Sequence, residues 1–450
     1  MPDLFCVSQH DGASVEAGNG IVIVMLKAEQ VGGGLGAALS EAGGPDGTQS
    51  GPLAGAHLIY FGPGQWAGLW RNRHHLLSRF ADHNRVLYVE PAIHLKTFRR
   101  EWWAGRLGWQ QMWRELRQCR ISQAGPNLYI YHSPTFLPVA GRFPLDRLTY
   151  ALWLAALKAA LRRLKFADPI VWFSRPEMVS LIGRLPARLT IYHVVDEYTG
   201  YEGVTGDLAA ELRRQETELM ARAQMVVVVS PELWQAKRAC NPHTYLVPNG
   251  TDLKAFTQAA RQPGPPADLA EIPEPRLIYA GLVGTRLDLP MLIALARRRS
   301  DWSVVVIGEV DARGCEAEIA SLRALPNVHI LGVRPVTAVP RYLLASQVCL
   351  LPYRRSVETD HIDPLKLYDG LAAGKPIVAS PIPAVQPYDG LVRLAYGVDA
   401  FETAVEAALG EHDESLVAAR RAAAAASTWE TRFQQLSTLI EARLNGALTG

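Results

Sequence analysis

The chain has 450 residues, and its charged fraction of 20% and hydrophobic fraction of 48% are those of an ordinary globular protein with enough apolar material for a large core. Its 46 basic and 44 acidic residues leave a formal net charge of +2. This near-balance excludes a wholesale nucleic-acid binder and a disordered polyelectrolyte. The length fits two large α/β domains.

The sequence carries no signal for export, membrane spanning or disulfide bonding. Its five cysteines lie far apart and form no Cys-x-x-Cys pair, so we expect neither a structural zinc site nor a disulfide framework. No apolar run reaches the roughly 18 residues that a membrane-spanning helix needs. Asp3 and Asp11 stand where a signal peptide requires basic residues. We therefore expect a cytoplasmic protein.

Residues 1–56 differ in composition from the rest of the chain. Nine of the 25 residues from Val31 to Gly55 are glycine. Such a stretch cannot bury enough side chain to offset the entropy cost of ordering it, which predicts a disordered extension. The alternative is a strand at Ile21–Leu26 followed by a phosphate-binding glycine loop at residues 32–36.

A series of short apolar strands separated by helical patterns begins at residue 57. The first strand runs into the turn Gly62-Pro63-Gly64, and a helix with apolar residues at helical spacing follows at Arg73–His83. This alternation predicts parallel strands with helices on both faces of the sheet. The predicted strands are His57–Phe61, Arg85–Glu90, Leu128–Tyr131, Pro169–Phe173, Leu189–His193 and Met225–Val229.

A second series of the same kind follows a proline-rich stretch at residues 258–275, which we interpret as an interdomain linker. Helical patterns alternate with its strands and then form a helical tail. We therefore predict an α/β protein of two doubly wound, Rossmann-like domains, at 57–257 and 276–425, with a C-terminal helix at 426–450. The predicted strands are Arg276–Ala280, Ser303–Ile307, Val328–Leu331, Val348–Pro352 and Pro376–Ala379.

The strongest motif spans residues 363–380. Pro364 suits the first turn of a helix and Asp363 is a good N-cap residue, so the helix start is expected to attract an anion. Lys366 can add a full charge to a phosphate there, and Asp369 lies on the same face at i+3. A carboxylate in that position can accept hydrogen bonds from two vicinal hydroxyls, such as those of a ribose. The alternative is an ordinary amphipathic helix with an exposed Lys–Asp pair.

This stretch resembles the nucleotide-sugar signature of GT-B glycosyltransferases, in the form found in enzymes similar to the teichuronic acid biosynthesis glycosyltransferases. The resemblance covers roughly residues 57–445 and rests on the order and spacing of several short pieces. These pieces are Arg73–Leu77, Val86–Pro91, Tyr192–Tyr198, Val229–Leu233, Leu246–Asp252, Ile278–Gly281, Leu325–His329 and Leu331–Pro335. It implies a GT-B architecture whose C-terminal domain binds a nucleotide diphosphate sugar.

The resemblance also implies roles for individual residues on the donor side. Lys366 and Arg286 would meet the diphosphate, and Asp369 would hold the ribose although most relatives have Glu at that position. Glu358 would touch the donor sugar. The full implied set for the nucleotide sugar is Gly281, Gly284, Arg286, Val333, Arg334, Glu358, Pro364, Leu365, Lys366, Leu367, Tyr368 and Asp369. Within it, Val333 and Arg334 would bind the base largely through backbone groups.

The N-terminal half is expected to carry the acceptor and a catalytic base. Asp196 and Glu197 follow a strand end that faces the expected interdomain site, and His193 is a further candidate for removing a proton from an acceptor hydroxyl. For a strand-end acid, the alternative role is to cap the next segment, and a retaining enzyme needs no such base. The acceptor-side candidates are Gly62, Gly64, His74 and His75, and for Gly62 and Gly64 a tight turn is the simpler interpretation.

Interleaved tryptophans and arginines near residues 96–120 suit the headgroup region of an anionic membrane. The candidates are Arg99, Arg100, Trp102, Trp103, Arg106, Trp109 and Trp113. Domain packing with a solvated basic face is the main alternative, and stacking on single-stranded nucleic acid is a weaker one.

The function expected from these features is transfer of a sugar from a UDP or GDP sugar to a hydroxyl of a glycan or lipid-linked glycan in surface polysaccharide biosynthesis. Lysine, arginine and the helix dipole can offset the diphosphate charge, so we expect no metal and no cofactor besides the nucleotide sugar as co-substrate. The expected location is the inner face of the cell membrane. A nucleotide-sugar epimerase and a non-catalytic scaffold of the same fold are the alternatives.

Overall fold

The computed structural model describes residues 53–92, 95–105, 108–110, 120–134 and 145–446. The predicted extension at residues 1–56 thus lies outside the described residues as far as position 52. Leu53 is buried, and its carbonyl accepts a hydrogen bond of 2.7 Å from the side-chain amide of Asn84. Residues 53–56, which the prediction counted with the extension, therefore belong to the folded part of the chain.

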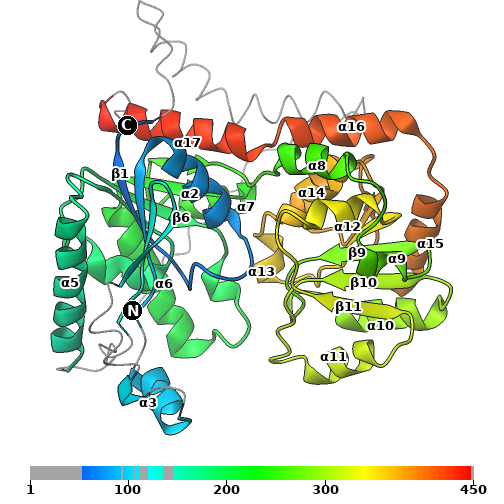
Figure 1. The fold of residues 1–450 in the computed structure, drawn as a ribbon, viewed down its shortest axis with the longest axis horizontal. Coiled ribbons are helices and arrows are strands. Elements are labelled where there is room, and N and C mark those ends of the chain that lie inside the picture. Colours follow the sequence, from blue (N-terminus) through cyan, green and yellow to red (C-terminus); the bar gives the residue numbers. More distant parts are fainter. Residues whose placement is uncertain (1–52, 93–94, 106–107, 111–119, 135–144, 447–450) are drawn as a thin grey trace, which may run out of the picture. The chain divides into compact units, whose positions relative to one another are not determined.

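The N-terminal half forms an eight-stranded sheet that is parallel except for one edge strand (Figure 1). The antiparallel edge strand β3 and the short strand β8 were not predicted, whereas the six predicted strands are confirmed to within one residue at each end. In spatial order the strands are β3 (Ile121–Gly125), β4 (Leu128–Tyr131), β2 (Arg85–Val89), β1 (His57–Phe61), β5 (Ile170–Phe173), β6 (Leu189–Val194), β7 (Met225–Val228) and β8 (Thr244–Leu246).

The C-terminal half forms a six-stranded parallel sheet in the doubly wound order of dinucleotide-binding folds. The five predicted strands are confirmed, and the short edge strand β14 was not predicted. In spatial order the strands are β11 (Val328–Gly332), β10 (Ser303–Ile307), β9 (Arg276–Ala280), β12 (Val348–Leu351), β13 (Ile377–Ala379) and β14 (Arg393–Leu394).

Helices cover both faces of each sheet, which is why the central strands are apolar along their whole length. In β1, Ile59 and Phe61 pack into one core, while Leu58 and Tyr60 pack into a second core on the opposite face. The helices of the N-terminal half are α2 (Asn72–His83), α3 (Leu95–Trp103), α5 (Leu145–Arg163), α6 (Gly206–Arg222) and α7 (Pro231–Lys237), with the short 3-10 turns η1 (Pro176–Leu181) and η2 (Tyr198–Gly200).

The helices of the C-terminal half surround a single large core. They are α8 (Leu253–Ala260), α9 (Ala267–Ala270), α10 (Leu289–Arg298), α11 (Glu316–Arg323), α12 (Val339–Leu344), α13 (Val357–Asp360), α14 (Leu365–Ala373), α15 (Val398–Leu409) and α16 (Glu414–Ala425), with the 3-10 turn η3 (Pro383–Tyr388). Pro364 rather than Asp363 is the N-cap of α14, so the predicted helix start is shifted by one residue.

The proline-rich stretch at 258–275 contributes to the C-terminal core. Leu269 of α9 is fully buried there, and Ile272 and Phe256 of the flanking segments join the same cluster. The prolines lie between α8, α9 and β9, and apolar residues among them reach the core. This stretch is thus a packed part of the C-terminal domain and does not act as a flexible linker.

The last helix, α17 (Trp429–Leu444), packs on the N-terminal domain, although it follows the C-terminal domain in sequence. Trp429, Phe433 and Leu436 lie in the same core as Leu77 and Phe80 of α2. Figure 1 shows α17 beside α2 and α16 beside α14. The chain therefore passes between the two domains twice.

Candidate active site

The candidate site lies where loops at the carboxyl ends of the two parallel sheets come into contact. Strand order reverses between β9 and β12 in one sheet and between β1 and β5 in the other, and ligands of open α/β sheets bind at such points. Arg286 follows β9, Glu358 follows β12 and Asp196 follows β6. These three side chains come from three separate predictions, and the structure brings them together.

Arg286 makes ion pairs with carboxylates from both domains. Its Nε lies 2.6 Å from Glu358 Oε1, and one of its terminal nitrogens lies 3.2 Å from Asp196 Oδ1. Tyr201 donates a hydrogen bond of 2.7 Å to the other Asp196 oxygen, and the Arg286 guanidinium lies 5.5 Å from the Tyr201 ring centre. Burial acts to lower the pKa of Arg286, but the two carboxylates raise it above its ordinary value. The guanidinium is thus permanently charged.

Lys366 lies over the turn that follows β9. A Cβ atom added to Gly281 would lie 2.0 Å from Lys366 Cε, so any larger residue there would displace the lysine side chain from this position. The Lys366 ammonium lies 5.2 Å from the centre of the Tyr279 ring. Burial, together with the positive charges of Arg286 and Arg71, lowers the pKa of Lys366 to about 8. Within the described part of the chain, no hydrogen bond from this ammonium is recorded.

Asp369 lies one turn along α14 from Lys366 and faces a hydroxyl. Its Oδ1 accepts a hydrogen bond of 2.7 Å from Thr251, in the segment that connects the two domains. Burial raises the pKa of Asp369 to about 6, although Thr251 and the charge of Lys366 act in the opposite direction. The carboxylate is therefore mostly ionised at neutral pH and retains acceptor capacity for further hydroxyls.

Asp363 does not cap α14. Its Oδ2 accepts a hydrogen bond of 2.6 Å from the backbone amide of Asn249, and its Oδ1 accepts one of 2.8 Å from Tyr368. Of the other predicted α14 residues, Leu367 lies in the C-terminal core and Leu365 packs against the N-terminal core. The side chains of Leu365, Leu367 and Tyr368 therefore fix the position of the helix start rather than line the site.

A glycine follows each of the strands β9 and β10, and the two glycines lie close together. Gly281 and Gly308 have φ angles of +151° and +140°, and a Cβ atom at Gly308 would lie 2.0 Å from the Gly281 carbonyl oxygen. Gly284 packs near the backbone of Asp311, where an added Cβ atom would lie 3.1 Å from the Asp311 oxygen. The backbone can thus approach a ligand at these strand ends without side chains in the way.

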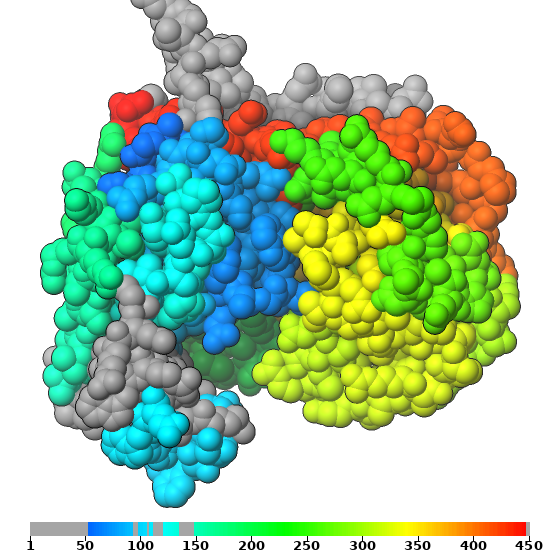
Figure 2. All heavy atoms as spheres, in the orientation of Figure 1, coloured from blue at the N-terminus to red at the C-terminus, as the bar shows by residue number. Residues whose placement is uncertain are grey.

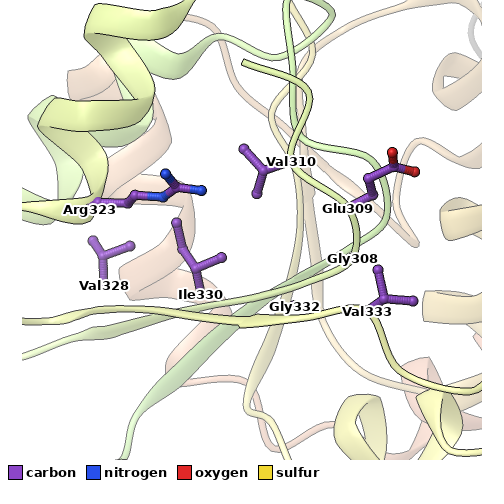
Figure 3. A pocket seen from close by; sticks show the side chains of 8 residues that line it. All are labelled: Gly308, Glu309, Val310, Arg323, Val328, Ile330, Gly332 and Val333. Atoms are coloured by element: carbon purple, nitrogen blue, oxygen red, sulfur yellow. The ribbon is translucent and has the colours of Figure 1, made fainter. Parts of the chain in front are cut away.

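A pocket of about 620 Å³ opens at the carboxyl ends of β10 and β11 (Figure 3). Its lining includes Gly308, Glu309, Gly332 and Val333, with Arg323 on the opposite side. Its volume is within the range of small-molecule sites. The predicted base-binding residue Val333 therefore lines a pocket.

The side chain of Arg334 does not face the pocket but binds Asp268 and Tyr342. Its guanidinium lies 2.6 Å from Asp268 of α9 and 2.9 Å from the Tyr342 hydroxyl. Burial acts to raise the pKa of Asp268, but the hydrogen bonds from Arg334 and Tyr342 lower it below its ordinary value. Arg334 thus ties α9 to α12, and its side chain is not among the residues that line the pocket.

Solved structures with similar folds cover most of this chain. Sucrose-phosphate synthase from Thermosynechococcus elongatus aligns with a TM-score of 0.63 at 17% identity, covering 87% of this chain and 100% of that one. HepE from Anabaena, solved with UDP and glucose, aligns with a TM-score of 0.56 at 13% identity, covering 85% and 99%. WaaG, a glycosyltransferase of lipopolysaccharide biosynthesis, aligns with a TM-score of 0.52 at 15% identity, covering 88% and 100%.

Sequence comparison adds matches to glycosyltransferases. Residues 284–411 match the family of group 1 glycosyl transferases. TuaH of Bacillus subtilis (strain 168), described as a glycosyltransferase of teichuronic acid biosynthesis, is 26% identical over 282 residues, covering 59% of this chain and 70% of TuaH. The chain is a GT-B glycosyltransferase. The matched family region contains Arg286, Val333, Glu358, Lys366 and Asp369.

Two of the three catalytic candidates in the glycosyltransferase, Glu197 and His193, lie in surroundings that do not suit a general base. Glu197 lies 2.7 Å from Lys237, which also lies 2.7 Å from Glu216. Burial acts to raise the pKa of Glu197, but Lys237 and Thr199 lower it below its ordinary value, which suits an ion-pair partner and not a base. His193 is 1% exposed, and burial lowers its pKa to about 3. Asp196 remains the candidate base at the interdomain contact.

The predicted acceptor-side histidines of the glycosyltransferase both pack against aromatic rings. The Nδ1 of His74 accepts from the backbone amide of Arg71, and its Nε2 lies 2.8 Å from the Trp66 carbonyl. His75 stacks on Trp429 of α17 at 4.8 Å between ring centres. Burial lowers the pKa of His74 to about 4 and that of His75 to about 3, so both rings are neutral at pH 7. They hold α2 in place and do not provide protons.

The turn after β1 depends on Gly62 for a packing reason. A Cβ atom there would lie 1.9 Å from the Tyr88 hydroxyl oxygen. Tyr88 in turn donates a hydrogen bond of 2.7 Å to the Gly64 carbonyl, while the position of a Gly64 Cβ is open. Gly62 therefore shapes the turn, as the simpler interpretation expected, whereas Gly64 contributes only its carbonyl group.

The described part of the tryptophan and arginine patch lies on α3 and just after it. Trp103 is 82% exposed and Trp109 is 65% exposed, and the rings of Trp102 and Trp109 meet edge to face at 5.5 Å. Arg99 and Arg100 are exposed on the same helix. In Figure 2 this segment (cyan) lies at the periphery of the N-terminal half. Arg106 and Trp113 lie outside the described residues.

Sequence reasoning missed Tyr201, Thr251 and Asn249, which contact the predicted carboxylates of the glycosyltransferase. Asn249 and Thr251 belong to the Leu246–Asp252 piece of the resemblance, so a signal for them was present. No such signal marks Tyr201, since it contacts Asp196 only after the short turn η2 folds back. The polar surroundings of the site thus come largely from loops.

No group of three or more histidine, cysteine, aspartate or glutamate side chains among the described residues is placed to hold a metal ion. No helix in those same ranges combines the length and apolar character needed to cross a membrane.

Proposed function

We propose that this glycosyltransferase moves a sugar from a UDP or GDP sugar to a hydroxyl of a glycan or lipid-linked glycan in surface polysaccharide biosynthesis. The observation that carries the donor assignment is the pair of cations, Lys366 and Arg286, at the carboxyl ends of β9 and β12. The described roles of TuaH and WaaG support the pathway class, and the UDP and glucose bound to HepE support the donor class.

On the donor side, each part of the nucleotide sugar has a matching group. Lys366, Arg286 and the start of α14 hold the diphosphate, because an ammonium, a guanidinium and free helix N–H groups all favour an anion. Asp369 accepts hydrogen bonds from the ribose. The base enters the pocket beside Val333, and Glu358 contacts the donor sugar.

The chemical step forms a bond between the acceptor oxygen and the anomeric carbon of the sugar. The bond from that carbon to the diphosphate oxygen breaks. The acceptor proton passes to Asp196 if the configuration is inverted, or to an oxygen of the departing diphosphate if it is retained. Stabilisation of the departing diphosphate by Lys366 and Arg286 is the largest contribution, since charge develops there in the transition state. With two cations in place, we propose that the step uses no metal.

A thermal shift panel tests the donor assignment. A ligand that binds only the folded protein raises the unfolding midpoint by mass action. We expect UDP, GDP or their sugars to raise the midpoint of the wild-type chain and to lose this effect with Lys366→Ala. A chain that is stabilised by no nucleotide would contradict the proposal. Nucleotide-sugar conversion without an acceptor would indicate an epimerase, and binding without any turnover would indicate a scaffold.

We also propose that α3 holds the protein at the inner face of the cell membrane. Exposed tryptophans beside arginines fit the headgroup region of anionic lipids, and a lipid-linked acceptor would be within reach there. We expect the wild-type chain to float with vesicles that contain anionic lipid, and the double variant Trp103→Ser/Arg100→Gln to float several-fold less. Equal flotation of the variant, or none by the wild type, would remove the membrane assignment.

A further inference from the structure

The segment that connects the two domains of this glycosyltransferase holds the donor-side helix α14 at two points. Asp363, just before α14, accepts a hydrogen bond of 2.6 Å from the backbone amide of Asn249. Further along the helix, Asp369 Oδ1 accepts a hydrogen bond of 2.7 Å from the Thr251 hydroxyl. The connecting segment therefore fixes both the start of α14 and the carboxylate that we assign to the ribose.

Thr251 is itself held by the second passage of the chain between the domains. Its backbone amide donates to the Ser427 carbonyl at 3.0 Å, and its own carbonyl accepts from the Trp429 amide at 3.1 Å. The two passages are pressed together, since a Cβ atom at Gly250 would lie 2.8 Å from the carbonyl carbon of Thr428. The fully buried, β-branched Thr251 thus presents its hydroxyl from a fixed backbone.

The Thr251 hydroxyl leaves most of the acceptor capacity of Asp369 unused. It contacts Oδ1, and no hydrogen bond to Oδ2 is recorded within the ranges that the structure describes. Asp369 is partly exposed, so its carboxylate is within reach of a ligand. An ionised carboxylate offers about four acceptor sites, which suffices for one protein hydroxyl and two ribose hydroxyls.

The charge of Asp369 depends on a small set of neighbours. Burial raises its pKa to about 6, Thr251 and the ammonium of Lys366 act to lower it, and Asp252 acts to raise it. The Cys349 thiol on β12 also lies near, but burial raises its pKa to about 12 and it stays neutral. Without the Thr251 hydroxyl, the pKa of Asp369 should rise further towards neutrality, and a protonated carboxyl has fewer acceptor sites.

We propose that Thr251 is a positioning residue for the donor, whose hydroxyl keeps the Asp369 carboxylate ionised and oriented to accept hydrogen bonds from the ribose. This inference rests on the proposed function, because it requires a ribose at Asp369. It makes the connection between the domains part of the donor site, although Thr251 acts through the carboxylate and does not touch the donor.

The test compares UDP and GDP with their 2′-deoxy forms by calorimetry at pH 7. The two members of each pair share one diphosphate and differ by one ribose hydroxyl, so their affinity ratio isolates the ribose contact. The wild type should bind the ribose form of its preferred nucleotide roughly tenfold more tightly than the deoxy form. Thr251→Val, which removes the hydroxyl at nearly constant volume, should reduce this preference to less than about threefold. Thr251→Ser should restore it.

Thr257→Val is the matched control. The Thr257 hydroxyl lies on α8, close to Thr251 in sequence, but it donates to the backbone carbonyl of Leu253 at 3.0 Å and to no carboxylate. This variant should therefore keep the ribose preference of the wild type.

The pH dependence of the ribose preference distinguishes positioning from a general loosening of the interdomain connection. In the wild type the preference should fall as the pH drops through about 6, where Asp369 takes up a proton. In Thr251→Val it should already fall at a higher pH, because the carboxyl has lost a group that favours its ionised form. Protonation of the diphosphate affects both members of a pair alike and cancels in the ratio. A loosened connection would lower the preference without moving its pH midpoint.

The outcomes separate the role of Thr251 from the donor assignment. If the wild type prefers the ribose form and Thr251→Val keeps both this preference and its pH midpoint, the positioning role is overturned and the proposed function stands. Loss of the preference in Thr251→Ser or Thr257→Val would also overturn it. If the wild type binds both forms equally, or binds neither nucleotide, the ribose assignment of Asp369 fails and the role of Thr251 fails with it.

Discussion

Lys366→Ala should lower the rate of sugar transfer by roughly a hundredfold to a thousandfold, in line with the loss of one group that stabilises transition-state charge. Lys366 lies over Gly281 at the start of α14, where the departing diphosphate gains negative charge under our proposal. Its pKa of about 8 leaves it mostly protonated at pH 7. The measurement is kcat and KM with a saturating acceptor.

The same variant should fold normally. No ion pair of Lys366 is recorded among the described residues, so its removal breaks none, and the nearby buried Asp369 keeps its hydrogen bond from Thr251. An unchanged or slightly higher unfolding midpoint is therefore expected, as for functional groups held at a cost to stability. Lys375→Ala, at the other end of α14, is the matched control and should transfer sugar at the wild-type rate. Wild-type transfer by Lys366→Ala would show that this lysine is not part of the donor site.

Lys237→Met, unlike Lys366→Ala, should cause a large loss of stability. Lys237 is buried between Glu197 and Glu216, at 2.7 Å from each. Removing one partner of a buried ion pair leaves uncompensated charge and typically costs about 3–5 kcal/mol of unfolding free energy. Urea denaturation at pH 7 measures this loss.

The pH dependence of this loss identifies its cause. Lys237 lowers the pKa values of both glutamates in the folded wild type, so its removal raises both, and the folded variant binds more protons than the folded wild type. Its stability deficit should thus shrink as the pH falls from 7 towards 5. Lys254→Met, on an exposed side chain, should change stability by less than about 0.5 kcal/mol. A deficit for Lys237→Met that is small, or that does not change with pH, would contradict the ion-pair account.

The architecture was largely predictable because buried parallel strands are apolar along their whole length. β1, β6 and β9 each stand out as short runs of β-branched and aromatic residues between helical patterns. β3, with the sequence Ile-Ser-Gln-Ala-Gly, lies at the sheet edge with three exposed residues in its middle, so no such run marks it. The proline-rich stretch was misread because composition does not show that Leu269 reaches the core.

The candidate site was harder to predict, because its contacts join residues far apart in sequence. Asp196 and Glu197 are adjacent, yet one meets Arg286 of the other domain and the other meets Lys237 of its own domain. Nothing in a single sequence shows which carboxylate has which partner. Local motifs did predict where Lys366 and Gly281 lie, since a helix start and a strand-end turn are encoded by neighbouring residues.

The most direct measurement is a crystal structure of the wild-type chain with the nucleoside diphosphate that gives the largest thermal shift. Our account predicts diphosphate oxygens within hydrogen-bond distance of Lys366 Nζ and the Arg286 guanidinium, with the base in the pocket beside Val333. A nucleotide bound elsewhere, with Lys366 away from its phosphates, would contradict the donor site on which the account rests.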